Sequence, residues 1–263
     1  MSNATPPVIT QDLFRQDAYL KECTARITAI GEQGIVLDRT VFYPLGGGQA
    51  GDSGGLVLPD GQELLIADTR KGKDAEGRPT LEICHLAAPN QEALLAALRV
   101  GEPVTARVDW ERRHKLMRFH TTTHLLCHLV PQLVNGCSIT PEYARLDFNM
   151  TEPLDKEALT AGIARLVAAG HPVTVGSITD EELDANPALV KSMSVQPPRG
   201  TGLVRTILIG RASADAGGMG GEVIDFQPCG GTHVANTAEI GAVVVTKIEK
   251  KSATTRRVVL GFA

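Results

Sequence analysis

The sequence predicts an α+β protein with two domains: a small N-terminal β-barrel, then a domain in which helices pack on a mainly antiparallel sheet. Short strand-like runs fill the first 110 residues, and at Trp110 the apolar period changes to that of a long helix. Beyond that helix, strand-like and helical runs alternate, and several strands close the chain. We therefore expect a barrel domain at residues 1–110 and an α+β domain at residues 111–263.

The composition excludes several classes of protein. The chain has 263 residues, of which 43% are hydrophobic and 21% charged, which suits two globular domains. No run approaches the roughly 20 apolar residues of a membrane-spanning helix, and the N-terminus has no signal-peptide pattern, so we expect a cytoplasmic protein. Five scattered cysteines make no disulfide framework, which leaves Cys229 available as a thiolate. The net charge of −4 argues against a general nucleic-acid coat but allows a local basic patch.

Short strands at regular spacing predict the barrel. Residues 25–44 alternate apolar and polar side chains about a turn at GEQG, as a half-buried hairpin does. A glycine-rich segment, LGGGQAGDSGGLVL, follows at 45–58, with six glycines in the ten positions from Gly46. Further strand-like runs lie at 60–70, 81–86 and 103–110, with a helical run at 90–100. Strands of this length suit a small barrel that ends near Trp110.

The second domain begins with a helix of roughly 20 residues at 111–130, which Pro131 ends. A strand-like run and an amphipathic helix ended by Gly170 come next, and the chain closes with a hairpin. The expected strands lie at 143–150, 171–179, 203–210, 241–250 and 255–262, and the expected helices at 155–170 and from 180. Residues 212–222 are rich in glycine and alanine and are expected to form a flexible loop.

Two histidines on the first helix of this domain are candidate metal ligands. In HTTTHLLCH, at 120–128, His120 and His124 are four residues apart and so share one face of a helix about one turn apart. Pairs at this spacing also occur on ordinary surface helices. His128 lies one turn further and is expected to be a structural or supporting residue rather than a ligand.

The segment PCGGTH, at 228–233, offers two more ligands. Two glycines disfavour regular structure between Cys229 and His233, and glycine's access to positive φ allows a tight loop around one point. The alternative is a small buried cysteine, a surface histidine and a simple turn. A set of three histidines and one cysteine suits tetrahedral Zn²⁺, so we expect zinc bound by His120, His124, Cys229 and His233.

Several motifs together resemble one known family. The stretches HTTTHLL and CGGTHV, with FYPLGGGQAGDSG before them and IGAVVVTKIEKKSATTRRV after, are similar to the editing domain of alanyl-tRNA synthetases. The resemblance runs from about Leu13 to Phe262 and is strongest to the freestanding editing proteins of the AlaX type, because no segment here would hold an aminoacylation domain. It implies an N-terminal barrel akin to a domain of translation factors.

The resemblance implies a deacylase that acts in trans on tRNA(Ala) mischarged mainly with serine, and secondarily with glycine. It assigns the four zinc ligands to the same residues, of which His120 and His124 are also expected to take part in catalysis. Rejecting alanine requires a polar partner for the serine hydroxyl. Thr140, in GCSITPEY, roughly matches the region where relatives place such a residue. An ordinary threonine in a turn or at the start of a strand is an equally good interpretation. Thr122 and Thr123 are weaker candidates.

Two further segments are expected to bind the tRNA substrate. In the glycine-rich loop, Gly46, Gly47 and Gly48 would bring backbone amides close to the terminal nucleotide, with side-chain contacts from Gln49 and Asp52, unless the loop is only a tight turn. Basic residues gather at 112–118 and in the last hairpin at 247–257, where they would neutralise phosphates or simply face water. In the hairpin we expect the contacts from Lys250, Lys251, Arg256 and Arg257.

Two alternatives to the deacylase remain open at this point. One is a metal-dependent hydrolase of small esters or amides, which would use the same site without tRNA. The other is a zinc-stabilised tRNA-binding module without catalysis. For the deacylase we expect charged tRNA(Ala) as the partner, no membrane partner, and a monomer.

Overall fold

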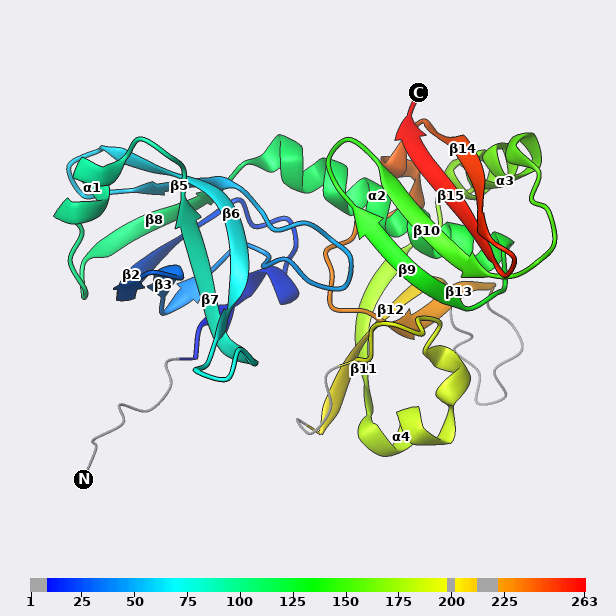
Figure 1. Cartoon of the computed structure of the whole chain (residues 1–263), viewed down its shortest axis with the longest axis horizontal. Coiled ribbons are helices and arrows are strands. Elements are labelled where there is room, and N and C mark those ends of the chain that lie inside the picture. The colour runs from blue at the N-terminus through cyan, green and yellow to red at the C-terminus, as the bar shows by residue number, and fades with distance from the viewer. Residues whose placement is uncertain (1–8, 198–201, 212–221) are drawn as a thin grey trace. The chain divides into compact units, whose positions relative to one another are not determined.

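The structure is a computed structural model, and it describes residues 9–197, 202–211 and 222–263. It is a mixed α+β structure with mainly antiparallel sheets, as the sequence predicts (Figure 1). Two compact units divide it: Met1–Gly46 with Ala50–Arg113, and Gly47–Gln49 with His114–Ala263. The flexible loop expected at 212–222 falls, except for Glu222, outside the described residues. Among the described helices, none is long and apolar enough to cross a membrane.

Six antiparallel strands of the first unit pair in a ring. The order is β2-β3-β7-β6-β5-β8, and pairing of β8 with β2 closes the barrel. Its strands are β2 (Glu22–Gly31), β3 (Gly34–Leu37), β5 (Gly54–Val57), β6 (Glu63–Lys73), β7 (Pro79–Ala87) and β8 (Pro103–Val108). Aliphatic side chains such as Ile27, Leu37 and Leu64 alternate inward and are fully or almost fully buried, so they make the core expected from a chain with few aromatic residues.

Smaller elements complete the first unit. A parallel pair joins β1 (Gln11–Asp12) to β4 (Arg39–Thr40), and a 3-10 turn, η1, covers Leu13–Arg15. The helix expected at 90–100 is shorter: α1 covers only Glu92–Ala97. Asn90 has φ of 64° and Leu98 is extended, so the backbone leaves the helical conformation on both sides.

The second unit holds two sheets. One is antiparallel in the order β14-β15-β10-β9, and the other in the order β11-β12-β13. Their strands are β9 (Val134–Ile139), β10 (Ala144–Asn149), β11 (Val173–Thr179), β12 (Leu203–Gly210), β13 (Val223–Pro228), β14 (Val243–Ser252) and β15 (Thr255–Phe262). The strands β9 and β13 were not expected from the sequence.

The helices follow their sequence signals closely. Helix α2 covers Trp110–Leu129, and α3 covers Lys156–Ala168, with the Asp155 side chain accepting a hydrogen bond from Ala158 N at its start. Gly170, with φ of 63°, ends α3. Thr179 and Glu182 make a capping box at the start of α4 (Asp180–Ala185), and short 3-10 turns follow at η2 (Pro187–Leu189) and η3 (Thr237–Ile240).

Helix α2 is buried along most of its length, from Leu116 onwards. Three consecutive threonines lie in this buried stretch, where an unpaired hydroxyl would be costly. Each hydroxyl donates to a carbonyl of the preceding turn: Thr121 to Met117, Thr122 to Arg118 and Thr123 to His120. The helix can therefore carry polar residues, including its histidines, through the interior of the second unit.

Candidate metal centre

Four side chains converge in the second unit. His120 and His124 project from α2, while Cys229 and His233 come from the loop that follows β13. One nitrogen or sulfur atom from each lies within 4.8 Å of all the others. The Sγ of Cys229 is 3.4 Å from His120 Nε2 and 3.3 Å from His233 Nε2. The three histidines are buried and Cys229 is half-buried, so the four residues form a largely enclosed cluster.

These distances fit one tetrahedral metal ion. With Zn–N near 2.0–2.1 Å and Zn–S near 2.3 Å, tetrahedral ligand atoms lie about 3.6 Å apart. The two sulfur–nitrogen separations, 3.3 and 3.4 Å, are close to that value. The cluster can therefore hold a metal ion.

Every histidine of the cluster has a partner on the nitrogen that faces away from it. His120 Nδ1 is 2.7 Å from Gln49 Oε1, and His124 Nδ1 is 2.7 Å from Asp225 Oδ2. His233 Nδ1 is 3.2 Å from the Thr121 hydroxyl. These partners fix the three rings so that the Nε2 atoms are left to bind an ion, which is the arrangement that metal-binding histidines generally have.

The CGGTH loop is shaped by close packing. A Cβ at Gly231 would lie 2.1 Å from His120 Cε1 and 2.8 Å from Gln49 Oε1, so only glycine fits there. Arg205, which lies in β12, holds the loop in place. Its Nη1 donates to the carbonyls of Cys229, at 2.6 Å, and Gly231, at 3.1 Å. Neither glycine of the loop has a positive φ. The expectation that these glycines are needed for positive φ was therefore wrong. Gly231 is needed because the loop backbone lies so close to the His120 ring.

Charge around the sulfur favours the thiolate. Burial by itself raises the pKa of Cys229, but its interactions with the neighbouring histidines, His120 foremost, outweigh burial and hold that pKa well below its usual range. Burial also lowers the pKa of His233, to about 3, with His120 adding to the effect. A thiolate beside a neutral imidazole is the form in which both residues bind metals.

The opposite side of the cluster is an ion-paired network. Burial by itself lowers the pKa of His124, but the hydrogen bond and charge of Asp225, together with Cys229, raise it to about 9. Burial raises the pKa of Asp225, yet His124 and Lys191 outweigh it and bring it to about 2. The buried carboxylate is therefore ionised and paired on both oxygens.

Comparisons with known proteins place this chain among proteins related to tRNA synthetases. The family model of the threonyl and alanyl tRNA synthetase second additional domain matches residues 173–259, and that of class II (A) tRNA synthetases matches residues 13–112. An alanyl-tRNA editing protein AlaX-M from Saccharolobus solfataricus is 32% identical over 254 residues, which cover 95% of this chain and 98% of the relative. The chain belongs to the AlaX-M family of alanyl-tRNA editing proteins.

Two more relatives illustrate the range of the likeness. The AlaX-M protein of Methanosarcina mazei is 30% identical over 262 residues, covering 95% of each chain. An alanine-tRNA ligase of Metallosphaera sedula is 33% identical over 254 residues, covering 93% of this chain but 25% of the ligase. The likeness thus spans both units of this chain. It covers nearly all of the two AlaX-M relatives but only a quarter of the ligase. The family resemblance drawn from the sequence motifs is confirmed.

Other residues singled out from the sequence have different surroundings. His128 is exposed and lies outside the cluster. The Thr140 hydroxyl lies within its own turn, where it donates to Tyr143 O and accepts from the backbone nitrogens of Glu142 and Tyr143. Thr140 therefore makes the hydrogen bonds of a turn-forming threonine.

The glycine-rich loop contributes to the cluster through one side chain. Gln49 is fully buried, accepts from His120 Nδ1 and Thr232 N, and donates to the Thr232 hydroxyl. Gly48 has φ of 84°, and a Cβ there would lie 2.9 Å from Cys137 Sγ, so this glycine allows the approach that places Gln49. Gly47 also has a positive φ, 58°, while the carbonyl of Gly46 accepts from the Tyr43 hydroxyl.

Asp52, which we expected to contact substrate, lies inside the first unit. Its carboxylate is buried and forms an ion pair with Arg113, whose guanidinium also donates to the carbonyls of Val41 and Ala18. It also accepts from Tyr43 N at 2.6 Å. The buried carboxylate is fully paired, so it has no surface to offer a nucleotide, and removing either partner would leave a buried charge unpaired. The side chain of Gln49 is likewise engaged, with His120 and Thr232.

Of the four hairpin residues expected to bind tRNA, two are exposed and two have partners within the protein. Lys250 and Lys251 are exposed, as phosphate binding requires. Arg256 is buried, and its guanidinium donates to carbonyls of the hairpin turn and to that of Thr151. Arg257 pairs with Asp147 through two hydrogen bonds, at 2.7 and 2.8 Å. In the other basic segment, Lys115 is exposed, whereas Arg112, Arg113 and Arg118 donate to carbonyls.

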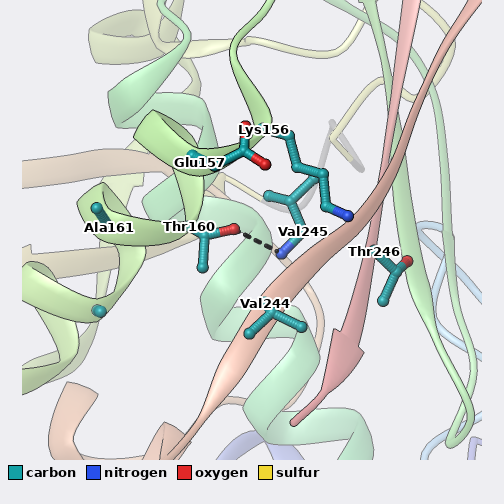
Figure 2. A pocket seen from close by; sticks show the side chains of 8 residues that line it. Lys156, Glu157, Thr160, Ala161, Val244, Val245 and Thr246 are labelled. Atoms are coloured by element: carbon teal, nitrogen blue, oxygen red, sulfur yellow. Dashed lines mark hydrogen bonds between the residues drawn. The ribbon is translucent and has the colours of Figure 1, made fainter.

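A hollow elsewhere in the second unit is separate from this chemistry. It lies between α3 and β14 (Figure 2). Its lining residues are Lys156, Glu157, Thr160, Ala161, Ala164, Val244, Val245 and Thr246. None of them belongs to the cluster or contacts a cluster histidine through a hydrogen bond described above, so we assign this hollow no part in the site.

Sequence reasoning missed Asp225, Gln227 and Lys191. A signal for the first two exists, because side chains of a strand alternate and residues 225 and 227 therefore share one face of β13. A polar pair on one face of a strand just before Cys229 would have suggested a shared site. Lys191 carries no such signal, since it lies in an irregular segment 34 residues before Asp225.

Proposed function

We propose that this protein hydrolyses the ester bond of tRNA(Ala) mischarged with serine, and to a lesser degree with glycine, at a zinc ion held by His120, His124, Cys229 and His233. The observation that carries the proposal is the enclosed set of three Nε2 atoms and one thiolate in a chain of the AlaX-M family. We propose the same domain division as the sequence suggested, with a barrel domain at residues 1–110 and a zinc-binding deacylase domain at residues 111–263.

The donor set favours zinc over harder cations. Imidazole nitrogen and thiolate sulfur suit Zn²⁺, whereas Mg²⁺ and Ca²⁺ prefer oxygen. When bound, zinc supplies a Lewis acid that polarises an ester carbonyl or lowers the pKa of a water molecule. A site closed by four ligands is usually structural, so we propose that one of the four residues would give way to water or substrate during hydrolysis. Cys229 is the half-buried member of the four, so we propose that it is the one beside which the ester approaches.

The residues of the chain itself do the remaining work. The buried histidines keep bulk water away from the reacting ester, and the partners on Nδ1 prevent their rings from rotating. Arg205 holds the carbonyls of the CGGTH loop, which keeps Cys229 facing the cluster. Lys250 and Lys251 are exposed, and we propose that they neutralise phosphates of the tRNA.

Selectivity for serine requires a partner for its hydroxyl. The hydroxyl hydrogens of Thr122, Thr123 and Thr140 are each donated to a backbone carbonyl, so each threonine would have to accept from serine. Thr140 already accepts from two backbone nitrogens, which makes it the least available of the three. Thr123 is buried, and it lies in the segment of α2 that carries His120 and His124, so we propose it as the better candidate.

The deciding experiment is hydrolysis of Ser-, Gly- and Ala-tRNA(Ala) by purified protein, with zinc measured on the same sample. We expect about one zinc per chain and much faster deacylation of Ser-tRNA(Ala) than of Ala-tRNA(Ala), because a site built to bind a hydroxyl disfavours the analogue that lacks it. The variant His120→Ala with Cys229→Ala should lose both zinc and activity.

Other outcomes separate the competing functions. Cleavage of free esters without any preference for charged tRNA would indicate a small-ester hydrolase. Tight tRNA binding by zinc-loaded protein without hydrolysis of any of the three substrates would overturn the deacylase and leave a binding module. Absence of zinc after expression in zinc-supplemented medium would remove the metal site.

A further inference from the structure

Asp225 lies behind the metal cluster and has both carboxylate oxygens engaged. Its side chain is fully buried in β13, and Oδ2 is 2.7 Å from His124 Nδ1. Oδ1 forms an ion pair with Lys191 Nζ. Gln227 Nε2 donates to Oδ2 at 2.8 Å. A buried carboxylate with this many donors is held in one orientation.

The contacts determine which nitrogen of His124 carries a proton. A carboxylate can only accept, so the 2.7 Å contact requires a hydrogen on His124 Nδ1. Gln227 Nε2 also lies 3.2 Å from that nitrogen, but both are then donors, and they share Oδ2 of Asp225 as their acceptor. With Nδ1 protonated, a neutral His124 offers the lone pair of Nε2 to the cluster.

The residues that hold Asp225 come from separate parts of the second unit. Gln227 is two positions along β13, so it lies on the same face of the strand. Lys191 is fixed by the backbone: Val134 N donates to its carbonyl at 2.8 Å, and Met193 N donates to Val134 O at 2.9 Å. These bonds attach the segment around Lys191 to β9, so the ammonium group meets Asp225 as part of the fold.

Asp225 differs from the partners of the other two histidines. His120 is held by the neutral amide of Gln49, and His233 by the neutral hydroxyl of Thr121. Only His124, among the histidines of the cluster, has a charged partner. A carboxylate both orients an imidazole and makes its other nitrogen a stronger donor to a metal. Of the three supporting contacts, that of Asp225 should therefore contribute most to metal affinity.

We infer that Asp225 is a positioning residue that holds His124 as the Nδ1–H tautomer with Nε2 toward the metal, and that Lys191 and Gln227 hold Asp225 in that role. The inference rests on the metal site of the proposed function. It assigns Asp225 no contact with substrate. Its effect is expected in metal affinity, and in activity only through the metal.

The test compares Asp225→Asn with Asp147→Asn in the full chain. Asp147 is a matched control, because it also pairs with two basic residues, Arg145 and Arg257, but does so between β10 and β15. Zinc dissociation constants would be measured by competition with a chromophoric chelator. We expect Asp225→Asn to bind zinc about 10–100-fold more weakly than the wild type. Asp147→Asn should bind zinc as the wild type does.

Two further measurements test the inference even if the Asp225→Asn variant does not fold. In zinc-loaded wild type, ¹⁵N NMR should show His124 protonated at Nδ1 and metal-bound at Nε2. Lys191→Met, which leaves the carboxylate in place but frees one of its oxygens, should weaken zinc binding by a few-fold. Thermal unfolding of the metal-free proteins would show that each variant is folded.

The outcomes separate this inference from the proposed function. Wild type that binds no zinc overturns the metal site on which both depend. Wild type that binds zinc, with a folded Asp225→Asn variant of equal affinity, overturns the positioning role alone. If His124 bound zinc through Nδ1, the positioning role would be overturned as well, because that nitrogen could then donate no hydrogen bond to Asp225.

Discussion

Gly231 and His120 pack so closely that no other residue fits at position 231. A Cβ built on Gly231 would lie 2.1 Å from Cε1 and 2.3 Å from Nδ1 of the His120 ring. The loop that carries two of the four candidate ligands therefore rests directly on the ring of a third. The geometry of the cluster depends on this contact as well as on the ligands themselves.

Gly231→Ala should displace His120 or the CGGTH loop. We expect zinc affinity to fall by at least about tenfold, and the free energy of unfolding of the zinc-free protein to fall by about 1–3 kcal/mol, the usual cost of overpacking. Calorimetric zinc titration and denaturant unfolding would measure the two effects. Gly31→Ala is the control, because a Cβ there meets nothing within 4 Å. Unchanged zinc affinity in Gly231→Ala would show that the contact does not shape the site.

The four candidate ligands could be predicted from the sequence because their spacing is local. His120 and His124 are one helical turn apart, and Cys229 and His233 belong to one short loop. The supporting contacts could not be predicted in this way, since they join residues far apart in the chain: Gln49 and His120 are 71 residues apart, and His124 and Asp225 are 101 apart. Such pairs form only after the sheets and α2 have packed.

The elements show a similar division between local and tertiary causes. Helix α3 has its cap at Asp155 and its stop at Gly170, so its range was predictable within a few residues. Strand β9 was missed because its segment VNGCSI has no apolar alternation; it is held by pairing with β10. Arg256 was assigned to a surface patch, although residues 256, 258 and 260 alternate inward along β15.

His85 should make the first unit less stable in acid. Its ring is fully buried, with Nδ1 2.9 Å from Ile35 O and Nε2 2.8 Å from the Thr40 hydroxyl. Burial lowers its pKa from 6.5 to about 4, against the smaller effect of the Ile35 carbonyl. The unfolded chain therefore binds a proton first as pH falls. Stability should be complete above about pH 6.5 and decline by about 3 kcal/mol down to about pH 4.

NMR of the His85 Cε1 proton, with denaturant unfolding of the first unit between pH 4 and 7, would check this expectation. The ring signal should stay in its neutral position until the pH approaches 4. A His85→Asn variant is the comparison, and its unfolding free energy should depend less on pH over this range. A ring that titrates near pH 6.5 in the folded protein would contradict the assignment of a buried neutral imidazole.

Thr140→Val should affect stability more than selectivity. The substitution keeps the shape of the side chain but removes one donated and two accepted hydrogen bonds from the turn at 140–143. We expect a loss of about 1–3 kcal/mol in unfolding free energy. The ratio of Ser-tRNA(Ala) to Ala-tRNA(Ala) deacylation should stay within about twofold, since a discriminating hydrogen bond would change it far more. A collapse of that ratio with zinc content intact would instead make Thr140 the residue that recognises serine.

The two exposed lysines of the last hairpin should account for its contribution to tRNA binding. Each phosphate contact that is lost reduces the slope of log affinity against log salt by about 0.9 on duplex nucleic acid, so Lys250→Ala with Lys251→Ala should reduce it by about 2. Replacing Arg256 and Arg257 by alanine should leave the slope unchanged and destabilise the hairpin, because their guanidinium groups already bind carbonyls and Asp147. Filter binding across a salt series would measure both pairs, with the exposed pair Lys71→Ala and Lys73→Ala of β6 as a charge-matched control. If the arginine pair changes the salt slope and the lysine pair does not, the hairpin contacts tRNA through a rearranged turn, and its lysines only face water.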